Sequence, residues 1–217
     1  VRVKLSDRTS PDRQAVVTGA AGWLGPNLVR TLVAQGREVR DLVQHADEAP
    51  LLELIGPGVS TVAGDVRNPA TLDALFDGAS GASVFHCAAV IHPATVREFF
   101  DINVGGTELV VDQVRRSGAI RLVHVSSNSP FGANARPTDR FSEDSPLHPY
   151  MGYGESKVEA EAIVRRGVER GDIDAVTVRA PWFYGPAQPP RDPHGPKAAR
   201  HAGQAALAAS IERLVSA

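Results

Sequence analysis

The sequence predicts a doubly wound α/β fold, a parallel sheet with helices on both of its faces. Short apolar runs rich in β-branched residues alternate with helical patterns along most of the chain. The connections between these runs are long enough for the crossovers that parallel strands require. A glycine-rich turn separates the first run from the helical pattern that follows it. Six strands are expected, at residues 14–18, 37–43, 59–63, 82–86, 121–126 and 175–179.

Helices are expected between the strands, at residues 23–35, 70–76, 96–117 and 150–168. Two segments show neither the strand pattern nor the helix pattern. Residues 127–149 are rich in Ser, Asn, Pro and Asp and follow the fifth strand, at the sheet edge where open α/β folds bind ligands. Residues 186–196 contain five prolines, and an alanine-rich helix is expected after them at 197–215.

The composition indicates one ordinary domain, with 217 residues of which 42% are hydrophobic and 22% charged. A net charge of -2 without a dense Lys/Arg run argues against nucleic acid or a membrane surface as a partner. No apolar stretch approaches the roughly 18 to 20 residues of a spanning helix, and residues 1–12 do not resemble a signal peptide. The single cysteine, Cys87, cannot form an internal disulfide and is expected to be a small core residue. We therefore expect a cytoplasmic protein.

The glycine-rich turn has the order of a nucleotide-binding site: a strand, a tight turn and the start of a helix. Gly19 can make the turn, Gly22 lets a pyrophosphate approach the backbone, and Gly25 allows the helix to pack closely on the strand. The N-terminus of the helix then offers free N–H groups and a positive dipole end to phosphate groups. Pro26 is compatible with the first turn of this helix.

Tyr153 and Lys157 are spaced to lie on one face of the helix expected at residues 150–168. A free tyrosine has a pKa of about 10, and a nearby ammonium group favours the phenolate. The pair therefore suggests a tyrosine that acts as a general base or acid, although this spacing alone is common in helices. Tyr150 is a poorer candidate for the base, because Gly154 occupies its i+4 position.

These two motifs together resemble the extended branch of the short-chain dehydrogenase/reductase superfamily, the NAD-dependent epimerase/dehydratase type. The resemblance rests on Thr-Gly-x-x-Gly-x-x-Gly from Thr18 and on Tyr-x-x-x-Lys from Tyr153. Between and after them, further segments are similar to the family: Gly64-Asp65-Val66, His86-Cys87-Ala88-Ala89, Asn103, and Arg179-Ala180-Pro181-Trp182-Phe183-Tyr184-Gly185-Pro186, in which Ala180 replaces the usual proline. The resemblance covers residues 14–190 and implies an NAD(P)-binding Rossmann domain at 12–190.

The resemblance implies a catalytic site of Ser127, Tyr153 and Lys157. Ser127 would bind the reacting oxygen of the substrate, Tyr153 would move its proton, and Lys157 would lower the tyrosine pKa and hold the nicotinamide ribose. Ser126 and Ser129 are the neighbouring alternatives to Ser127. The implied cofactor contacts are Gly19, Ala21, Gly22, Trp23, Leu24, Gly25, Asp65, Val66, Ala88, Ala89, Asn103, Tyr153, Lys157 and Pro181. No metal site is expected, because His86, His92 and His124 lack ligand spacing.

The cofactor is expected to be NAD or NADP. An NAD site places an acid near the end of the second strand, where an NADP site places an arginine. The position of that acid is Val43, and Gln44 stands where NADP reductases carry the arginine. Asp41, Asp47 and Glu48 are acids close to this position, and they favour NAD.

The resemblance implies an oxidoreductase, epimerase or dehydratase that acts on a sugar nucleotide or a sterol-like alcohol. The alternative is a catalytically silent dinucleotide-binding regulator or scaffold. Residues 191–217 resemble none of the family and are expected to be a helical tail, the remnant or replacement of a reduced or truncated substrate lobe. A truncated or frame-shifted chain is the hypothesis here, with a compact member carrying a short helical cap as the alternative. A homodimer through the helices at 96–117 and 150–168 is also expected.

Overall fold

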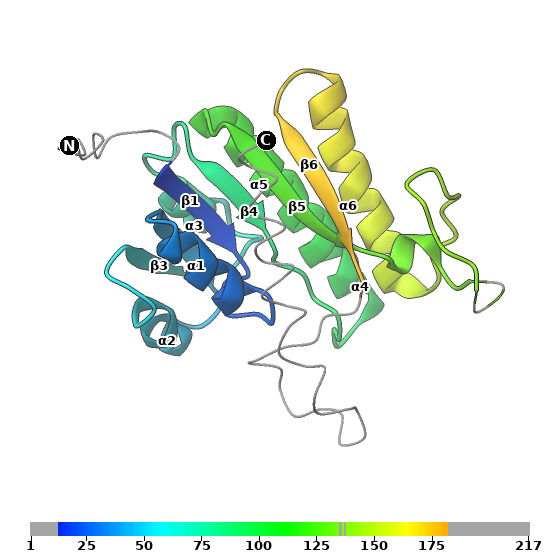
Figure 1. The fold of residues 1–217 in the computed structure, drawn as a ribbon, viewed down its shortest axis with the longest axis horizontal. Helices are drawn as coiled ribbons and strands as arrows, with labels where there is room; N and C mark the ends of the chain where they lie inside the picture. The colour runs from blue at the N-terminus through cyan, green and yellow to red at the C-terminus, as the bar shows by residue number, and fades with distance from the viewer. Residues whose placement is uncertain (1–12, 135, 137, 182–217) are drawn as a thin grey trace, which may run out of the picture.

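The protein folds as one parallel sheet with helices on both faces, as a computed structural model shows (Figure 1). The structure describes residues 13–134, 136 and 138–181. The strand order is β3-β2-β1-β4-β5-β6. The strands are β1 Gln14–Thr18, β2 Glu38–Val43, β3 Val59–Ala63, β4 Ser83–His86, β5 Arg121–Ser127 and β6 Ala175–Ala180. Each neighbouring pair is parallel, and the predicted doubly wound α/β fold is confirmed.

The helices follow the predicted order with two differences. They are α1 Gly25–Ala34, α2 Ala49–Glu53, α3 Pro69–Leu75, α4 Val96–Glu98, α5 Gly106–Ser117 and α6 Met151–Glu169, with short 3₁₀ turns η2 Ala46–Glu48 and η4 Ser129–Phe131. The single helix expected at 96–117 is interrupted by a π-helical segment, η3 Phe99–Gly105. Helix α2 was not predicted, because it is short and leaves Leu51 and Leu54 largely exposed. The helix predicted at 197–215 lies outside the described residues.

The two faces of the sheet form two separate cores. One core packs α1 and α2 against alternate residues of the strands, among them Val17, Val39 and Phe85. The other packs α3, α5 and α6 against the intervening residues, among them Val16 and Val84. In Figure 1, α1 lies in front of the sheet, and α5 and α6 lie behind it. The alternation is that of strands buried on both faces.

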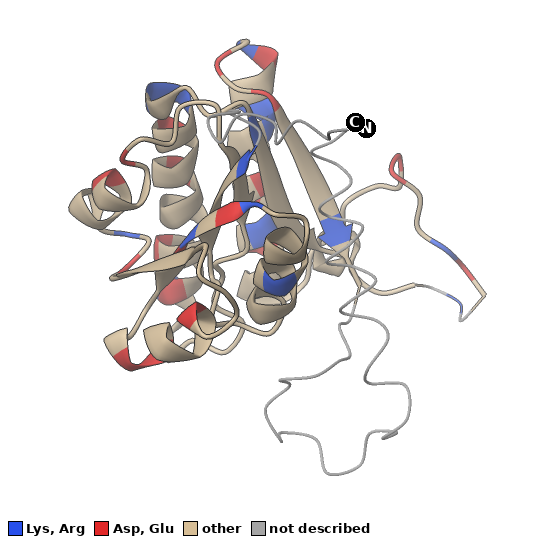
Figure 2. Ribbon diagram, turned by 60° about the vertical axis from the view of Figure 1, so that its left-hand side comes forward, with Lys and Arg blue, Asp and Glu red and all other residues tan. Residues whose placement is uncertain are grey.

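The strand order reverses between β1 and β4, because the chain builds outwards from β1 to β3 and then returns to β4. The segments that follow these two strands separate at this point, so a crevice forms at their carboxyl ends. Cys87 still donates from its backbone nitrogen to the carbonyl oxygen of Thr18 at 3.1 Å, which ties the two strand ends together. Acidic and basic residues are distributed over the surface helices without forming a single-sign stripe (Figure 2).

Candidate functional site

The turn between β1 and α1 depends on glycine at two positions. Gly19 has a φ of +73°, and a Cβ there would lie 2.6 Å from the backbone nitrogen of Ala88. A Cβ on Gly25 would lie 2.1 Å from the carbonyl oxygen of Ala20. Contacts this short with backbone atoms require the chain itself to shift. The two glycines thus allow β1, the start of α1 and the segment after β4 to approach one another closely.

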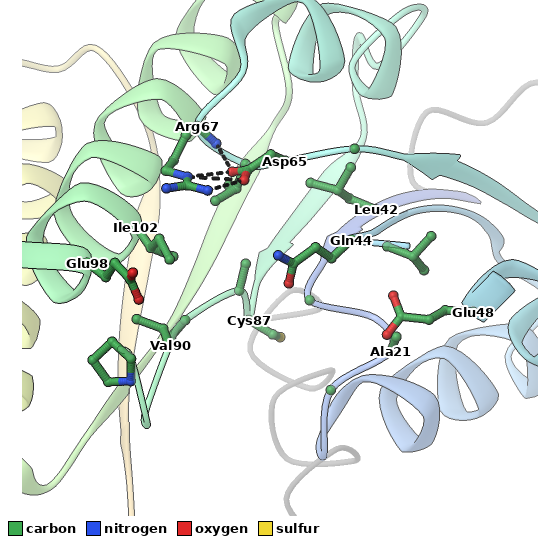
Figure 3. Close-up of a pocket in the computed structure, with 18 of the residues that line it drawn as sticks. Ala21, Leu42, Gln44, Glu48, Asp65, Arg67, Cys87, Val90, Glu98 and Ile102 are labelled. Carbon is green, nitrogen blue, oxygen red and sulfur yellow. Dashed lines mark hydrogen bonds and ion pairs between the residues drawn. The ribbon is translucent and has the colours of Figure 1, made fainter. Parts of the chain in front are cut away.

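A pocket of about 490 Å³ opens beside this turn (Figure 3). Its walls are the segments that follow β1, β2, β3 and β4, so it lies where the strand order reverses. The predicted cofactor residues that line it are Gly19, Ala21, Gly22, Asp65, Val66, Ala88 and Ala89. The predicted residues outside its lining are Trp23, Leu24, Gly25, Asn103, Pro181, Ser127, Tyr153 and Lys157. The pocket therefore brings together the residues around the glycine turn, and the catalytic candidates lie beyond it.

Asp65 carries a negative charge in this pocket. Its carboxylate accepts hydrogen bonds from Arg67, at 2.9 Å from Nε to Oδ1 and 2.5 Å from Nη2 to Oδ2. These bonds hold the pKa of Asp65 below its usual value. Figure 3 shows the two side chains paired at the end of β3. Arg67 lines the pocket but was not predicted, because no sequence pattern linked it to the family motif.

Among the three acids near the end of β2, only Glu48 lines the pocket. Its Oε2 accepts from the backbone nitrogen of His45 at 3.0 Å, and in Figure 3 its carboxylate lies near Ala21 and across from Gln44. Asp41 is fully buried within the sheet, where it pairs in register with the strands on either side, and cannot reach the pocket. Asp47 is not a lining residue.

Tyr153 is partly buried in the first turn of α6, with its ring centroid 5.9 Å from that of Phe99. Burial raises the pKa of its phenol, and a side-chain hydrogen bond with Ser127 opposes this shift in part. Burial sets the upward direction of the shift, and Lys157 is not among its causes, so the lowering of the Tyr153 pKa by Lys157 stays a prediction. The phenol is protonated at neutral pH.

Lys157 lies behind the tyrosine, only 2% exposed. Its ammonium group donates to the carbonyl oxygen of Val125 at 2.8 Å, so the side chain runs from α6 to β5. Burial lowers its pKa to about 8, and the charge of Glu161 opposes that shift. The lysine and the tyrosine share a helix face as predicted, but the ammonium is held by the strand.

Three serines, Ser126, Ser127 and Ser129, lie at or just after the end of β5, and their surroundings differ. The hydroxyl of Ser127 accepts from the backbone nitrogen of Ser129 at 3.1 Å and is the one that reaches Tyr153. Ser126 is buried and donates to Glu161 at 2.5 Å. The hydroxyl of Ser129 is buried without a hydrogen-bond partner. These positions favour Ser127 over its neighbours as the residue that binds a substrate oxygen.

Asn103 connects the loop after β4 to α6. Its side chain exchanges two hydrogen bonds with the backbone of Val90, at 2.8 Å and 3.2 Å, and donates to the hydroxyl of Ser156 at 3.0 Å. Ser156 in turn donates to the carbonyl oxygen of Tyr153 at 2.9 Å. Asn103 is buried and holds these segments together. Ser156 was not predicted.

Two of the three histidines that lack ligand spacing lie in the core. His86 and His124 stack with ring centroids 5.4 Å apart, and His86 bonds the hydroxyls of Thr18 and Thr107 at 2.7 Å and 3.0 Å. Burial lowers the pKa of both imidazoles, so both are neutral. His92 lines the pocket. Within the described part of the chain, no three His, Cys, Asp or Glu residues are placed to hold a metal ion.

The chain is similar to a known family and to several known proteins. The model of the "NAD dependent epimerase/dehydratase family" matches residues 15–214. The match extends beyond residue 190, where the sequence analysis expected the resemblance to end. An uncharacterised protein of Sinorhizobium fredii is 41% identical over 81% of this chain and 52% of its own length. A protein of Methylococcus capsulatus described as sterol demethylase protein B is 31% identical over 79% of this chain and 53% of its own length.

Solved structures share the fold. The NAD complex of UDP-glucose 4-epimerase from Thermus thermophilus superposes with a TM-score of 0.73 and 27% identity, covering 84% of this chain and 58% of that one. The chain thus spans about half the length of the curated relatives it matches. Among the described residues, no helix is long and apolar enough to cross a membrane.

Proposed function

Because the chain belongs to the NAD-dependent epimerase/dehydratase family, in the extended short-chain dehydrogenase/reductase superfamily, we propose that it carries the cofactor and proton-transfer half of an enzyme. The reaction is the oxidation or reduction of a substrate hydroxyl or carbonyl, with Ser127, Tyr153 and Lys157 as its catalytic residues. The observation that carries the proposal is the approach of Ser127 and Tyr153 on neighbouring elements, β5 and α6.

The residues around the pocket fit a dinucleotide. Gly19 and Gly25 let β1, α1 and the segment after β4 pack closely. Gly22 lines the pocket, where a pyrophosphate would approach the backbone, and the first turn of α1 offers free N–H groups. Charged Asp65 and the small Ala88 and Ala89 line the adjoining space. Bound at this crevice, NAD would supply the hydride acceptor or donor.

Glu48 supports NAD over NADP as the cofactor. A carboxylate that lines the pocket at the end of β2 can accept hydrogen bonds from ribose hydroxyls and repels a phosphate at the same place. Gln44, beside it, provides no positive charge for that phosphate. The role expected for an acid near Val43 therefore goes to Glu48, which extends from η2.

The chemistry of this chain is a proton transfer. The Ser127 hydroxyl would donate a hydrogen bond to the substrate oxygen and so place it against Tyr153. With its raised pKa, the Tyr153 phenol holds a proton that it can give to that oxygen during reduction. During oxidation the phenolate takes the hydroxyl proton, and a charged Lys157 lowers the free-energy cost of forming the phenolate.

We propose a sugar nucleotide or a sterol-like alcohol as substrate. Two of the similar proteins support these classes. One is described as a UDP-glucose 4-epimerase, from Thermus thermophilus, and the other as sterol demethylase protein B, from Methylococcus capsulatus. Both classes present a secondary alcohol that can be oxidised to a ketone, which suits a serine and a tyrosine acting on one oxygen.

The test compares the unmodified protein with the Tyr153→Phe variant. NADH fluorescence measures cofactor binding, and absorbance at the nicotinamide band measures turnover on a panel of sugar nucleotides and hydroxysteroids. We expect unchanged cofactor binding and a loss of turnover of at least about a thousandfold, because the phenylalanine removes only the proton donor. Cofactor binding without turnover by the unmodified protein would instead support the catalytically silent regulator.

We also propose a homodimer formed through α5 and α6, which pack side by side behind the sheet (Figure 1). Sedimentation at several protein concentrations tests it. A single species with the mass of one chain at all concentrations would contradict it.

A further inference from the structure

A buried acid lies one helical turn beyond Lys157. Glu161 is only 5% exposed, and Tyr153, Lys157 and Glu161 follow one another at intervals of four residues on α6. A carboxylate is rarely buried unless it is paired, because the loss of hydration is costly. The proposed chemistry assigns Glu161 no task.

The Glu161 carboxylate joins α6 to two strands. Ser126 of β5 donates to its Oε1 at 2.5 Å. Arg179 of β6 donates from Nε at 3.1 Å and 3.0 Å to the two oxygens, and from Nη2 to Oε2 at 2.8 Å. The guanidinium also lies 4.8 Å from the ring centroid of Phe131. A forked arrangement of this kind fixes both orientation and distance.

The charge of Glu161 is unusual among the groups around Lys157. On the lysine's own helix these groups are Tyr153 and Glu161; from the sheet side they are His86, Cys87, His124 and, behind Glu161, Arg179. The two imidazoles are neutral because burial lowers their pKa. Burial raises the pKa of the Cys87 thiol to about 12, so the thiol is neutral too. Tyr153 is protonated.

We propose that Glu161 is a positioning residue whose buried carboxylate keeps Lys157 in its charged form and holds it at the end of β5. Of the described groups that act on Lys157, Glu161 is the one that forms an ion pair as a carboxylate, with Arg179. Arg179 limits the effect by sharing the same carboxylate. The inference rests on the proposed function for its consequence, since a charged Lys157 matters to catalysis only if Tyr153 transfers a proton.

The same carboxylate also positions the substrate-binding serine. Ser126 is held by Glu161, and Ser127 is the next residue along β5. Lys157 bonds the carbonyl oxygen of Val125, immediately before them. The end of β5 is therefore fixed to α6 by two hydrogen bonds, one from Lys157 and one to Glu161, on consecutive turns of the helix. These bonds fix the position of Ser127 relative to Tyr153.

The lysine content of the chain allows a direct measurement. Lys157 has only two counterparts, Lys4 and Lys197, so the lysine ¹³Cε signals of a labelled sample are three, and a Lys157→Arg variant assigns the one of interest. We expect this signal to titrate near pH 8 in the unmodified protein, the value to which burial lowers the lysine pKa. In Glu161→Gln the titration should move to lower pH by at least about one unit, because the opposite charge is lost.

The matched variants separate charge from packing. Glu159→Gln removes an exposed acid on the same helix and should leave the Lys157 titration in place. Arg179→Gln breaks the same ion pair but leaves the negative charge, so it should move the titration to higher pH. Movement to lower pH in both Glu161→Gln and Arg179→Gln would overturn the proposal, because loosening of the helix would then explain both. If Glu161→Gln fails to fold, Arg179→Gln alone decides by the direction of its shift.

A second readout tests the link to the cofactor. Calorimetric NAD affinity should fall about tenfold as the pH rises through the Lys157 titration, and the fall should begin at least about one unit lower in Glu161→Gln. An NAD affinity that falls at the same pH in both proteins would overturn the link. If the unmodified protein does not bind NAD, the proposed function fails, whereas the lysine titration still tests the role of Glu161 without any cofactor.

Discussion

The two halves of the sheet build their parts of the site from different materials. Around β1 to β3 the site is made largely of backbone and small side chains, with Gly19 and Gly25 allowing approaches that no other residue permits. Around β4 to β6 it is made of buried polar side chains, with Lys157, Glu161 and Ser126 joined across α6 and β5. In the proposed function, the first half would hold the dinucleotide by leaving space for it, and the second would place protons and charges around the substrate.

This difference predicts how each half responds to change. A site built from backbone fails sterically, and the failure is independent of pH. A site built from buried charges fails electrostatically, and its failure depends on pH and on the sign of the charge removed.

The largest effect should come from the glycine turn. In Gly19→Ala the new Cβ would lie 2.6 Å from the backbone of Ala88, so the turn must shift. We expect NAD affinity to fall at least about a hundredfold, and the protein to lose about 3 kcal/mol of stability from the positive φ and the displaced backbone. Calorimetric titration with NAD and urea unfolding measure the two quantities.

Gly78→Ala is the control for this change. Gly78 also has a positive φ, +70°, but nothing lies within 4 Å of the position of its Cβ. It should cost about 1 to 2 kcal/mol of stability and leave NAD affinity unchanged. Equal loss of affinity in both variants would break the view that close approach defines the first half.

Asp41 is the exception that sharpens the comparison, since it is a buried acid in the first half. Burial raises its pKa from 3.8 to about 6, so the folded protein binds the proton more tightly than the unfolded chain. The free energy of unfolding that depends on Asp41 is therefore highest below about pH 4. It falls by up to about 3 kcal/mol as the pH rises through about 6. Asp41→Asn should be that much more stable at pH 8 and about equal at pH 4.

Urea unfolding of both proteins at the two pH values measures this. A stability difference that stays constant between pH 4 and pH 8 would show that Asp41 does not titrate in this range.

A smaller effect is expected at Glu48, where the first half does use a charge. Glu48→Gln should weaken NAD binding about threefold to tenfold, because the glutamine oxygen still accepts a hydrogen bond but lacks the charge that strengthens it, and should improve the relative affinity for NADP. Asp47→Asn, its neighbour outside the pocket lining, is the matched control and should change neither. An NAD to NADP ratio unaltered by Glu48→Gln would remove Glu48 from cofactor selection.

The sequence was sufficient for the fold and for the glycine turn between β1 and α1. Alternating apolar runs placed all six strands, and the glycine spacing located a turn whose requirements are local in the chain. The sequence could not predict which of the three acids near β2 lines the pocket, because its pattern does not show that Asp41 is buried and Glu48 is not. A sequence lists charges but not their burial, and burial decided between them.

In the second half the sequence predicts Tyr153 and Lys157 as reacting groups but not the side chains that surround them. Tyr153 and Lys157 are four residues apart, so their proximity could be predicted, but the direction of the Tyr153 pKa could not, since it depends on burial. The partners of Glu161 come from β5 and β6, 35 and 18 residues away in the chain. The one available signal was the continuation of the four-residue interval to Glu161.

The most direct test of the central claim is a crystal structure of the protein with NAD. The two halves should meet on one ligand, with the adenine ribose beside Glu48, the pyrophosphate against the turn at residues 19–25, and the nicotinamide beside Tyr153 and Lys157. A dinucleotide bound elsewhere, or one with its nicotinamide directed away from Tyr153, would contradict the account.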